Sequence, residues 1–324
     1  MNIQHMRKID LYAGGIICLI LEIWERVKRI FFRNPPLIEQ PHKVLVTKYL
    51  GMGSILLATP MLRGLRAKYP QSRIVFLTFD SNARFAEQIP LIDEVLSIRT
   101  SSFPSFAGDL LRNIHKIRRE RYDVLFDLEF FPRFSTIVSY LSGAKVRVGY
   151  YLPKLWRGDL LTHQIHFNPH KHVTEVLSAQ LEPFGIKVAD FTLTPPRLKE
   201  DKAQKVGLLL KGRGVKEDES LIAVNVNASD LSMERRWPKE SFVELIKYIA
   251  ENKIGVRIAL VGSKGEAEYV KGVYDTLPEG VRERVINLAG SLDIEEFIAL
   301  LKKSALFITN DSGPLHIASA LGIP

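Results

Sequence analysis

Short apolar runs and amphipathic segments alternate along the chain from residue 43 onward. In the first half, the apolar runs that predict buried strands are 44–46, 74–79, 95–98, 122–128 and 146–148. The turn Gly51-Met52-Gly53 leads from the first run into residues 54–68, which have helical periodicity and are followed by Pro70. Strands that alternate with helices favour a parallel sheet covered on both faces, so the expected fold class is α/β.

The same rhythm restarts in the second half of the chain. Before it, Pro183, Gly185 and the run 193–196 interrupt the pattern, and we expect a domain boundary near residue 190. Beyond the boundary, the expected strands are 221–226, 256–261, 285–288 and 306–309, and the helices between and after them are 240–251, 267–277, 294–303 and a last one from residue 314. The chain therefore divides into an N-terminal segment (1–40) and two Rossmann-like domains (41–190 and 191–324). Where the sequence stops, the pattern predicts one more strand, so the second domain is expected to be incomplete here.

Residues 11–24 are almost continuously apolar apart from a glycine pair and Glu22. A helix of that length covers about 21 Å, less than the roughly 30 Å of a hydrocarbon core, so a spanning helix is not predicted. Apolar residues recur at helical spacing as far as Phe31, and basic residues surround them at Arg26, Lys28, Arg29 and Arg33. Two interpretations remain open: a helix that lies in an anionic membrane interface, or a helix that packs on the protein's own body.

Composition narrows the functional classes. The 324 residues are 46% hydrophobic and 25% charged, which is typical of a globular protein rather than a disordered or fibrous one. The single cysteine excludes an intramolecular disulfide and favours a reducing, cytoplasmic setting. The net charge of +9 suits nucleic acid, an anionic membrane or phosphorylated small molecules, but the basic residues are spread along the chain rather than gathered in one tract.

The most informative polar loop of the second half is residues 310–316, between a predicted strand and a predicted helix. We expect Asp311 and Ser312 to cap that helix and Gly313 to allow a ligand close to the backbone. The exposed N–H groups of the first turn would then face a phosphate, and His316 lies one turn further on.

Two other loops of the second half carry suitable groups. The loop 225–230, which includes Asn227 and Ser229, follows the first strand, and Arg235 and Arg236 beyond it offer forked donors for a diphosphate.

The second of these loops is a glycine turn after the next strand. It contains Gly262 and Ser263, and Glu266 beyond them can accept hydrogen bonds from ribose hydroxyls. Strand-to-helix turns often need glycine, so this turn by itself is weak evidence.

Taken in order, these motifs resemble glycosyltransferase family 9, the family of the ADP-heptose:lipopolysaccharide heptosyltransferases. The motifs of the second half are Trp237-Pro238, Gly262-Ser263 with Glu266, 288–290 and 310–318. Those of the first half are 51–54 through Pro60 and Leu65, Tyr122-Asp123 to Asp127, and Gly143 to Gly149. The resemblance spans residues 43–324 and is most specific at 311–316.

The resemblance implies a GT-B fold, with two Rossmann-like domains whose parallel sheets face a central cleft. The first domain would bind the acceptor, with Gly51, Gly53 and Arg133 on that side. The second would bind the donor, with the diphosphate held by Asp311, Ser312, Gly313, His316 and either Arg235 or Arg236, and the ribose by Glu266. A helix N-terminus and fixed cations then stabilise the leaving diphosphate, so neither a metal nor any other cofactor is expected.

In functional terms, the resemblance implies inverting transfer of a hexosyl or heptosyl group, such as heptose from ADP-heptose. The acceptor would be a lipopolysaccharide or another lipid-linked cell-surface glycan. The expected location is cytoplasmic and peripheral on the inner membrane, with no nucleic-acid partner.

One position departs from the family pattern. The heptosyltransferases carry their catalytic Asp after the glycine of the first turn, and this chain has Ser54 there. A serine hydroxyl does not act unaided as a base at neutral pH, so Glu129 and Asp127, at the end of the fourth predicted strand, are the alternative bases, with Asp80 a weaker one. The substitution also leaves open a nucleotide-binding family member without transferase activity.

Two further possibilities carry less weight. His163, His166, His170 and His172 form a cluster, but they match no recognised ligand set and no cysteine supports them, so we expect residues 172–175 to open a helix instead. A nucleotide-sugar epimerase of the other Rossmann-like type would need a Gly-x-Gly-x-x-Gly turn and a Tyr-x-x-x-Lys pair in suitable context, and the sequence lacks both.

Overall fold

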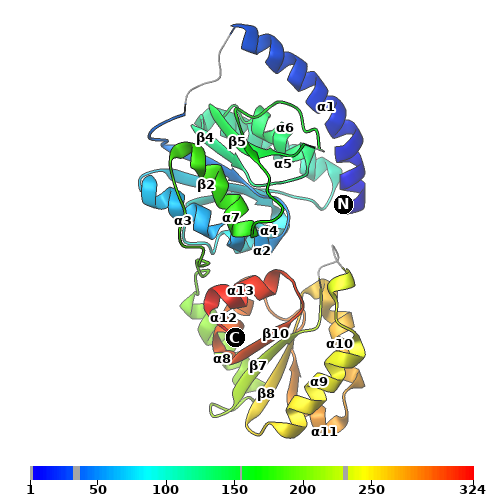
Figure 1. Cartoon of the computed structure of the whole chain (residues 1–324). Helices are drawn as coiled ribbons and strands as arrows, with labels where there is room; N and C mark the ends of the chain where they lie inside the picture. The colour runs from blue at the N-terminus through cyan, green and yellow to red at the C-terminus, as the bar shows by residue number, and fades with distance from the viewer. Residues whose placement is uncertain (1–2, 32–36, 154, 229–232) are drawn as a thin grey trace. The chain divides into compact units, whose positions relative to one another are not determined.

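The computed structural model describes residues 3–31, 37–153, 155–228 and 233–324. The chain divides into two compact units, Met1–Thr192 and Leu193–Pro324. Each unit is built on its own parallel sheet (Figure 1). The α/β class predicted from the alternation of strands and helices is therefore confirmed. Two residues of the sequence predictions, Arg33 and Ser229, lie outside the described residues.

The first unit contains a six-stranded parallel sheet in the order β3-β2-β1-β4-β5-β6. The strands are β1 (Lys43–Thr47), β2 (Arg73–Phe79), β3 (Glu94–Ile98), β4 (Val124–Asp127), β5 (Val146–Tyr151) and β6 (His163–His166). The helices are α1 (Ile3–Phe31), α2 (Met52–Leu57), α3 (Thr59–Lys68), α4 (Asp80–Ala86), α5 (Phe103–Glu120), α6 (Arg133–Leu141), α7 (Val173–Ser178) and the 3₁₀ helix η1 (Ala179–Phe184). Strand order reverses between β1 and β4, so the loops after these two strands diverge and leave a switch point at the carboxyl edge.

Helix α1 packs along one side of the first unit, beside α6 (Figure 1). Its buried residues Gly14, Cys18, Glu22 and Glu25 recur every three or four positions, which places them on one face. The interpretation that the helix packs on the protein's own body is therefore correct for this face. Among the described residues, no helix is long and apolar enough to cross a membrane.

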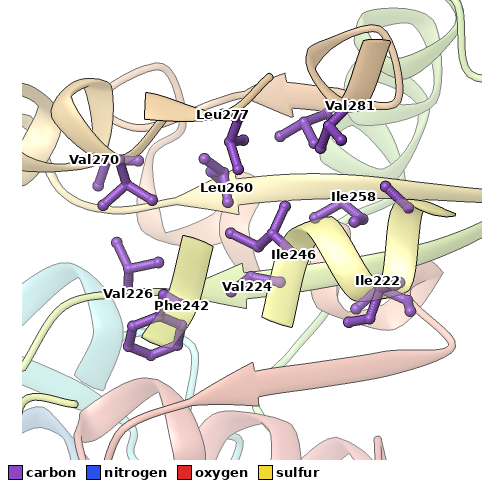
Figure 2. Close-up of a cluster of buried hydrophobic side chains, with 14 residues drawn as sticks. Ile222, Val224, Val226, Phe242, Ile246, Ile258, Leu260, Val270, Leu277 and Val281 are labelled. Carbon is purple, nitrogen blue, oxygen red and sulfur yellow. The ribbon is translucent and has the colours of Figure 1, made fainter. Parts of the chain in front are cut away.

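The second unit contains a four-stranded parallel sheet in the order β10-β7-β8-β9. Its strands are β7 (Ser220–Asn225), β8 (Val256–Val261), β9 (Val285–Asn287) and β10 (Leu306–Thr309). Its helices are α8 (Glu200–Gly212), α9 (Lys239–Asn252), α10 (Ala267–Thr276), α11 (Glu279–Arg282), α12 (Ile294–Lys303) and α13 (Gly313–Leu321), with 3₁₀ turns η2 (Met233–Arg235) and η3 (Lys264–Glu266). Side chains from β7, β8, α9 and α10 form the core on one face of the sheet (Figure 2). Fixed by that core, the strands present their carboxyl ends along one edge.

Two local predictions were wrong. The single helix expected over 54–68 is two helices that meet at Ala58, because Pro60 begins a new first turn and has no N–H to continue the earlier ladder. Strand β6 was not predicted, since its alternating half-exposed and exposed residues at the sheet edge have no apolar run to mark them.

Candidate functional site

The polar loops of the second unit meet at the carboxyl edge of its sheet. Because the four strands are parallel, residues 226–228, 262–266, 288–292 and 310–312 all leave the sheet on the same side. The predicted donor residues Asn227, Gly262 and Asp311 therefore share one edge.

The side chain of the residue before α13 does not cap the helix. Ser312 holds that position, and its side chain accepts no hydrogen bond from the first turn. Its hydroxyl instead lies 3.4 Å from the amide nitrogen of Asn225. The expectation that Asp311 and Ser312 cap the helix was therefore wrong, since Asp311 is engaged elsewhere. Pro314 has no N–H and the N–H of Leu315 donates to the carbonyl of Ser312 at 3.1 Å, so the helix end offers an anion the N–H of Gly313 together with the partial positive charge of the helix.

The two neighbouring arginines point to different partners. A guanidinium nitrogen of Arg235 donates to a carboxylate oxygen of Asp311 at 2.9 Å. The guanidinium of Arg236 lies 4.3 Å from the ring centroid of Tyr269 on α10. Arg235 is thus the cation beside the α13 N-terminus, and Asp311 orients it.

Asparagine side chains that were not singled out from the sequence hold this edge together. The amide nitrogen of Asn310 donates to the carbonyl of Asn227 at 2.9 Å, and its oxygen accepts the backbone N–H of Trp237 at 2.9 Å. Asn225 accepts both the backbone and side-chain N–H groups of Asn227, at 3.2 and 3.0 Å. These bonds join the loop that carries Arg235 to the ends of β7 and β10. Their sequence signal is an asparagine at the last position of β7 and one directly after β10.

The turn after β8 is restricted by packing. A Cβ at Gly262 would lie 2.8 Å from the amide nitrogen of Asn227, so no larger residue fits there without displacement. Glu266 accepts the backbone N–H of Ser263 at 2.7 Å in a reciprocal capping box. One oxygen of the Glu266 carboxylate is therefore used locally, and the carboxylate is held at the sheet edge. His316 lies half-buried one turn into α13.

In the first unit, the turn after β1 carries the predicted acceptor-side glycines. Gly51 has φ +82°, a left-handed conformation that favours glycine, and it precedes α2. Gly53 is buried in the first turn of α2, and Ser54 beside it is half-buried. This turn presents a hydroxyl, not a carboxylate, at the edge of the sheet.

Glu129 lies beneath this turn. One carboxylate oxygen accepts the backbone N–H groups of Tyr49 and Leu50, at 2.7 and 3.0 Å. The other forms an ion pair with Lys48 at 2.9 Å, and both side chains are about 6% exposed. These contacts fix the turn that leads to Ser54. They favour a positioning role for Glu129 over that of a solvent-facing base.

Asp127 is enclosed more completely. Its carboxylate accepts from Arg157 at 2.7 Å and from the hydroxyl of Ser135 at 2.8 Å. Arg157 also donates to the carbonyls of Glu129 and Pro132, at 3.0 and 3.1 Å, and so clamps the loop after β4. Burial raises the pKa of Asp127, and the charge of Arg157 opposes the rise. Neither Lys48 nor Arg157 was singled out from the sequence, and only Lys48, a buried charge two positions after an apolar run, carries a signal there.

Two further first-unit residues are placed by the structure. The backbone N–H of Arg133 donates to Asp10 of α1 at 2.9 Å, and its side chain lies against Gly14 of the same helix, which favours a structural role. Asp80 is exposed at the carboxyl end of β2, where one oxygen accepts the backbone N–H of Thr100 at 3.2 Å.

The histidines do not gather into a ligand set. His163 and His166 lie on β6, and His172 caps α7 by accepting the backbone N–H of Thr174 at 3.4 Å, so the expectation that a helix opens there is confirmed. Across the residues that the structure describes, no group of three or more His, Cys, Asp or Glu side chains is arranged to hold a metal ion.

Comparison with known proteins decides the family. Residues 110–324 match the family model of glycosyltransferase family 9 (heptosyltransferase). The chain belongs to glycosyltransferase family 9. The resemblance seen in the motifs is therefore confirmed, and the family model includes the whole candidate donor edge.

Individual relatives are distant but extensive. Lipopolysaccharide heptosyltransferase 2 of Escherichia coli is 24% identical over 300 residues, 87% of this chain and 81% of the relative. The family 9 glycosyltransferase structure of Veillonella parvula matches with a TM-score of 0.76 at 21% identity, over 89% of this chain and 80% of that one. An Escherichia coli heptosyltransferase solved with ADP matches with a TM-score of 0.65 at 18% identity, over 87% of this chain and 85% of that one. These likenesses support the GT-B assignment of the fold.

Proposed function

We propose that this family 9 glycosyltransferase moves a heptosyl or hexosyl group from a nucleoside diphosphate sugar to a lipopolysaccharide or other lipid-linked glycan. The observation that carries the proposal is the uncapped N-terminus of α13 with Arg235 held beside it by Asp311. An ADP-sugar is the preferred donor, because a relative of the same fold was solved with ADP. The proposed place of action is the cytoplasmic side of the inner membrane.

The donor edge is suited to a diphosphate without a metal ion. The helix N-terminus supplies the backbone N–H of Gly313 and partial positive charge, and Arg235 supplies a forked cation. Asp311 carries a negative charge, so its part is to orient Arg235, not to bind phosphate itself. Glu266 remains the proposed ribose ligand through the carboxylate oxygen that the capping box leaves unused.

Transfer with inversion needs four coupled events. The acceptor hydroxyl oxygen forms a bond to the anomeric carbon, the bond from that carbon to the diphosphate breaks, the diphosphate leaves with the electron pair, and a base takes the hydroxyl proton. The α13 end and Arg235 stabilise the charge that develops on the leaving diphosphate.

The exposure of the candidate carboxylates distinguishes which of them can act as the base. Glu129 and Asp127 are buried in ion pairs with Lys48 and Arg157, whereas Asp80 is exposed at the same sheet edge. Helix α4 begins at Asp80 and also contacts the turn after β1, because Asn82 donates to the carbonyl of Tyr49 at 2.9 Å. We therefore assign proton removal to Asp80, and to Glu129 and Asp127 the positioning of the two loops.

The donor site is tested by calorimetry with ADP, GDP and UDP in the presence of EDTA. Arg235→Gln is expected to weaken binding of the preferred nucleotide by about tenfold or more, since a charge-assisted hydrogen bond is lost. Arg236→Gln is the matched control, and we expect less than about a threefold change because that guanidinium stacks on Tyr269. Equal losses in both variants, or no binding by the folded wild-type protein, would contradict the assignment.

A second candidate function is nucleotide-sugar binding without transfer, which Ser54 favours because its family counterpart is the catalytic Asp. Turnover of ADP-heptose in wild type, Asp80→Asn and Ser54→Asp separates the two functions. Loss of turnover in Asp80→Asn, with nucleotide affinity retained, supports the transferase. No turnover in wild type, together with turnover gained in Ser54→Asp, supports the binding protein.

A further inference from the structure

Helix α1 directs its acidic residues toward the protein. Asp10 accepts the backbone N–H groups of Arg133 and Phe134 at 2.9 and 2.6 Å, and so caps α6. Glu22 accepts from the side chains of Arg26 at 2.5 Å and Trp156 at 3.1 Å. The polar groups on this side of α1 thus serve as its attachment to the first unit.

Glu25, the third acidic residue of the helix, also takes part in the contact between α1 and the rest of the first unit, which we call the seam. Glu25 lies 3.5 Å from the guanidinium groups of both Arg29 and Arg147. Arg29 in turn donates to Asp159 at 2.6 Å. All three acidic residues of α1 are therefore held in the seam, and none lies on the opposite face.

The opposite face of α1 is apolar and exposed. Half of the exposed large hydrophobic side chains in the described part of the chain lie on this one helix. Leu11, seven positions before Cys18, is on the packed side, and the others follow the opposite face: Ile9, Tyr12, Ile16, Ile17, Leu19, Ile20, Ile23, Trp24, Val27, Ile30 and Phe31. Trp24 is 65% exposed and Ile30 is 77% exposed. A helix on the surface of a protein in water normally shows the reverse arrangement, and a contiguous apolar patch of this kind marks an interaction surface.

Basic side chains line both margins of this apolar face. Lys8 and Arg26 are eighteen positions apart, five full turns, so they share one margin, whereas Lys28 lies on the other. All three are exposed. Arg26 and Lys28 each also lie near an acidic residue of the same helix, Glu22 at 2.5 Å and Glu25 at 3.8 Å, but both basic side chains remain more than half exposed. The face as a whole therefore combines apolar area with positive charge at its edges.

We propose that α1 lies flat in the interface of an anionic lipid bilayer, with its apolar face toward the acyl chains and its basic margins on the headgroup phosphates. Apolar area, flanking cations and an aromatic residue such as Trp24 at headgroup level are the chemistry of interfacial binding. A second copy of the chain suits this face less well, because pairing would bring cationic margins together with no acidic partner on either face.

Because the seam attaches α1 to α6, binding of α1 to a membrane has a functional consequence. Asp10 joins α1 to the first residues of α6, directly after the loop that carries Glu129 and the 58% exposed Phe131. The carboxyl edge of the first sheet is thereby held next to the membrane-binding helix. This consequence rests on the proposed function, in which a lipid-linked acceptor binds at the carboxyl edge of the first sheet.

The test is flotation of the full chain with vesicles of phosphatidylcholine alone and with vesicles containing phosphatidylglycerol. We expect binding to the anionic vesicles and a blue shift of Trp24 emission that Trp24→Phe removes. The triple variant Ile16→Glu, Ile20→Glu, Ile23→Glu should bind at least about a hundredfold more weakly, since three exposed apolar groups become anionic. Lys8→Gln, Arg26→Gln and Lys28→Gln should each weaken anionic binding by about fivefold.

Two matched controls keep the result specific. Leu208→Glu replaces a 72% exposed leucine on α8 of the second unit and should leave vesicle binding unchanged. Nucleotide affinity of the triple variant should equal that of wild type, so loss of vesicle binding is distinguishable from failure of the donor site. Unchanged flotation of the triple variant would overturn the proposal. So would a wild-type dimer that the triple variant dissociates and that does not bind vesicles.

Discussion

At the scale of residues, buried charges decide what the loops of the first unit can do. Glu129 and Asp127 are acidic residues two positions apart at a strand end, yet each is neutralised by a cation from another part of the chain. A carboxylate that holds two backbone N–H groups and an ammonium is well placed to fix a loop and poorly placed to accept a substrate proton. Exposure, not residue type, separates Asp80 from these two.

Glu129→Gln is expected to lower the free energy of unfolding of the first unit by about 3 kcal/mol, because it leaves the ammonium of Lys48 buried and unpaired. Denaturant unfolding measures this change. Glu87→Gln, an exposed glutamate of the same unit, is the control and should stay within about 0.5 kcal/mol of wild type.

The double variant Lys48→Met, Glu129→Gln separates the pair from its two members. It should recover most of the stability lost in Glu129→Gln, because the unpaired charge is removed. Strictly additive losses would show that the two side chains are not coupled, against the 2.9 Å contact between them.

At the scale of elements, the docking of α1 depends on small residues in its seam. A Cβ at Gly14 would meet the Cβ of Arg133 at 3.2 Å and a carboxylate oxygen of Asp10 at 3.2 Å. Cys18, the single cysteine, is fully buried one turn further along. Its pKa is raised by burial to about 11, so the thiol is protonated and shielded in the docked helix.

Gly14→Leu is therefore expected to loosen α1, even though leucine is the better helix former. Loosening exposes Cys18 and returns its pKa toward the ordinary range, which increases the thiolate fraction. Alkylation at pH 8 should be at least about tenfold faster than in wild type, where the rate rises only as the pH approaches the raised pKa.

Ala13→Leu is the matched control for this experiment, since Ala13 is exposed on the neighbouring position of the same helix. Its alkylation rate should equal that of wild type. Equal rates in Gly14→Leu and wild type would mean that the seam tolerates a large side chain.

The sequence was most informative about the secondary-structure elements. Strands such as 74–79 and 256–261 are almost continuously apolar, interrupted only by Thr78 and Arg257, because both faces of a parallel sheet are covered. Edge strand β6 and the break at Ala58 escaped prediction, since one depends on pairing with β5 and the other on a proline inside an otherwise periodic segment.

At the scale of the whole molecule, two units with separate sheets and cores predict two separable responses. A nucleotide that binds the donor edge stabilises the second unit by mass action, by about 2.7 kcal/mol at a concentration one hundred times the dissociation constant. The first unit should not respond, because its residues have no part in that edge.

Tryptophan fluorescence distinguishes the two units. Trp24 and Trp156 lie in the first and Trp237 in the second. In denaturant, saturating ADP should shift the transition reported by the Trp24→Phe, Trp156→Phe variant and leave that of Trp237→Phe in place. A shift confined to the first-unit signal would contradict the assignment of the donor to the second unit.

The sequence by itself determined the α/β class, the order of the motifs and the family, because strand and helix periodicity and loop motifs are local properties of the chain. It also indicated the donor loops, since parallel strands bring their carboxyl ends to one edge. Only the tertiary structure decided which arginine accompanies Asp311, which carboxylates are buried and which face of α1 is outward. These depend on contacts such as Lys48 with Glu129, Arg157 with Asp127 and Asp10 with Arg133, whose members lie far apart along the chain. No local pattern records such a partner, because burial and pairing are set by the packing of elements that the chain brings together only on folding.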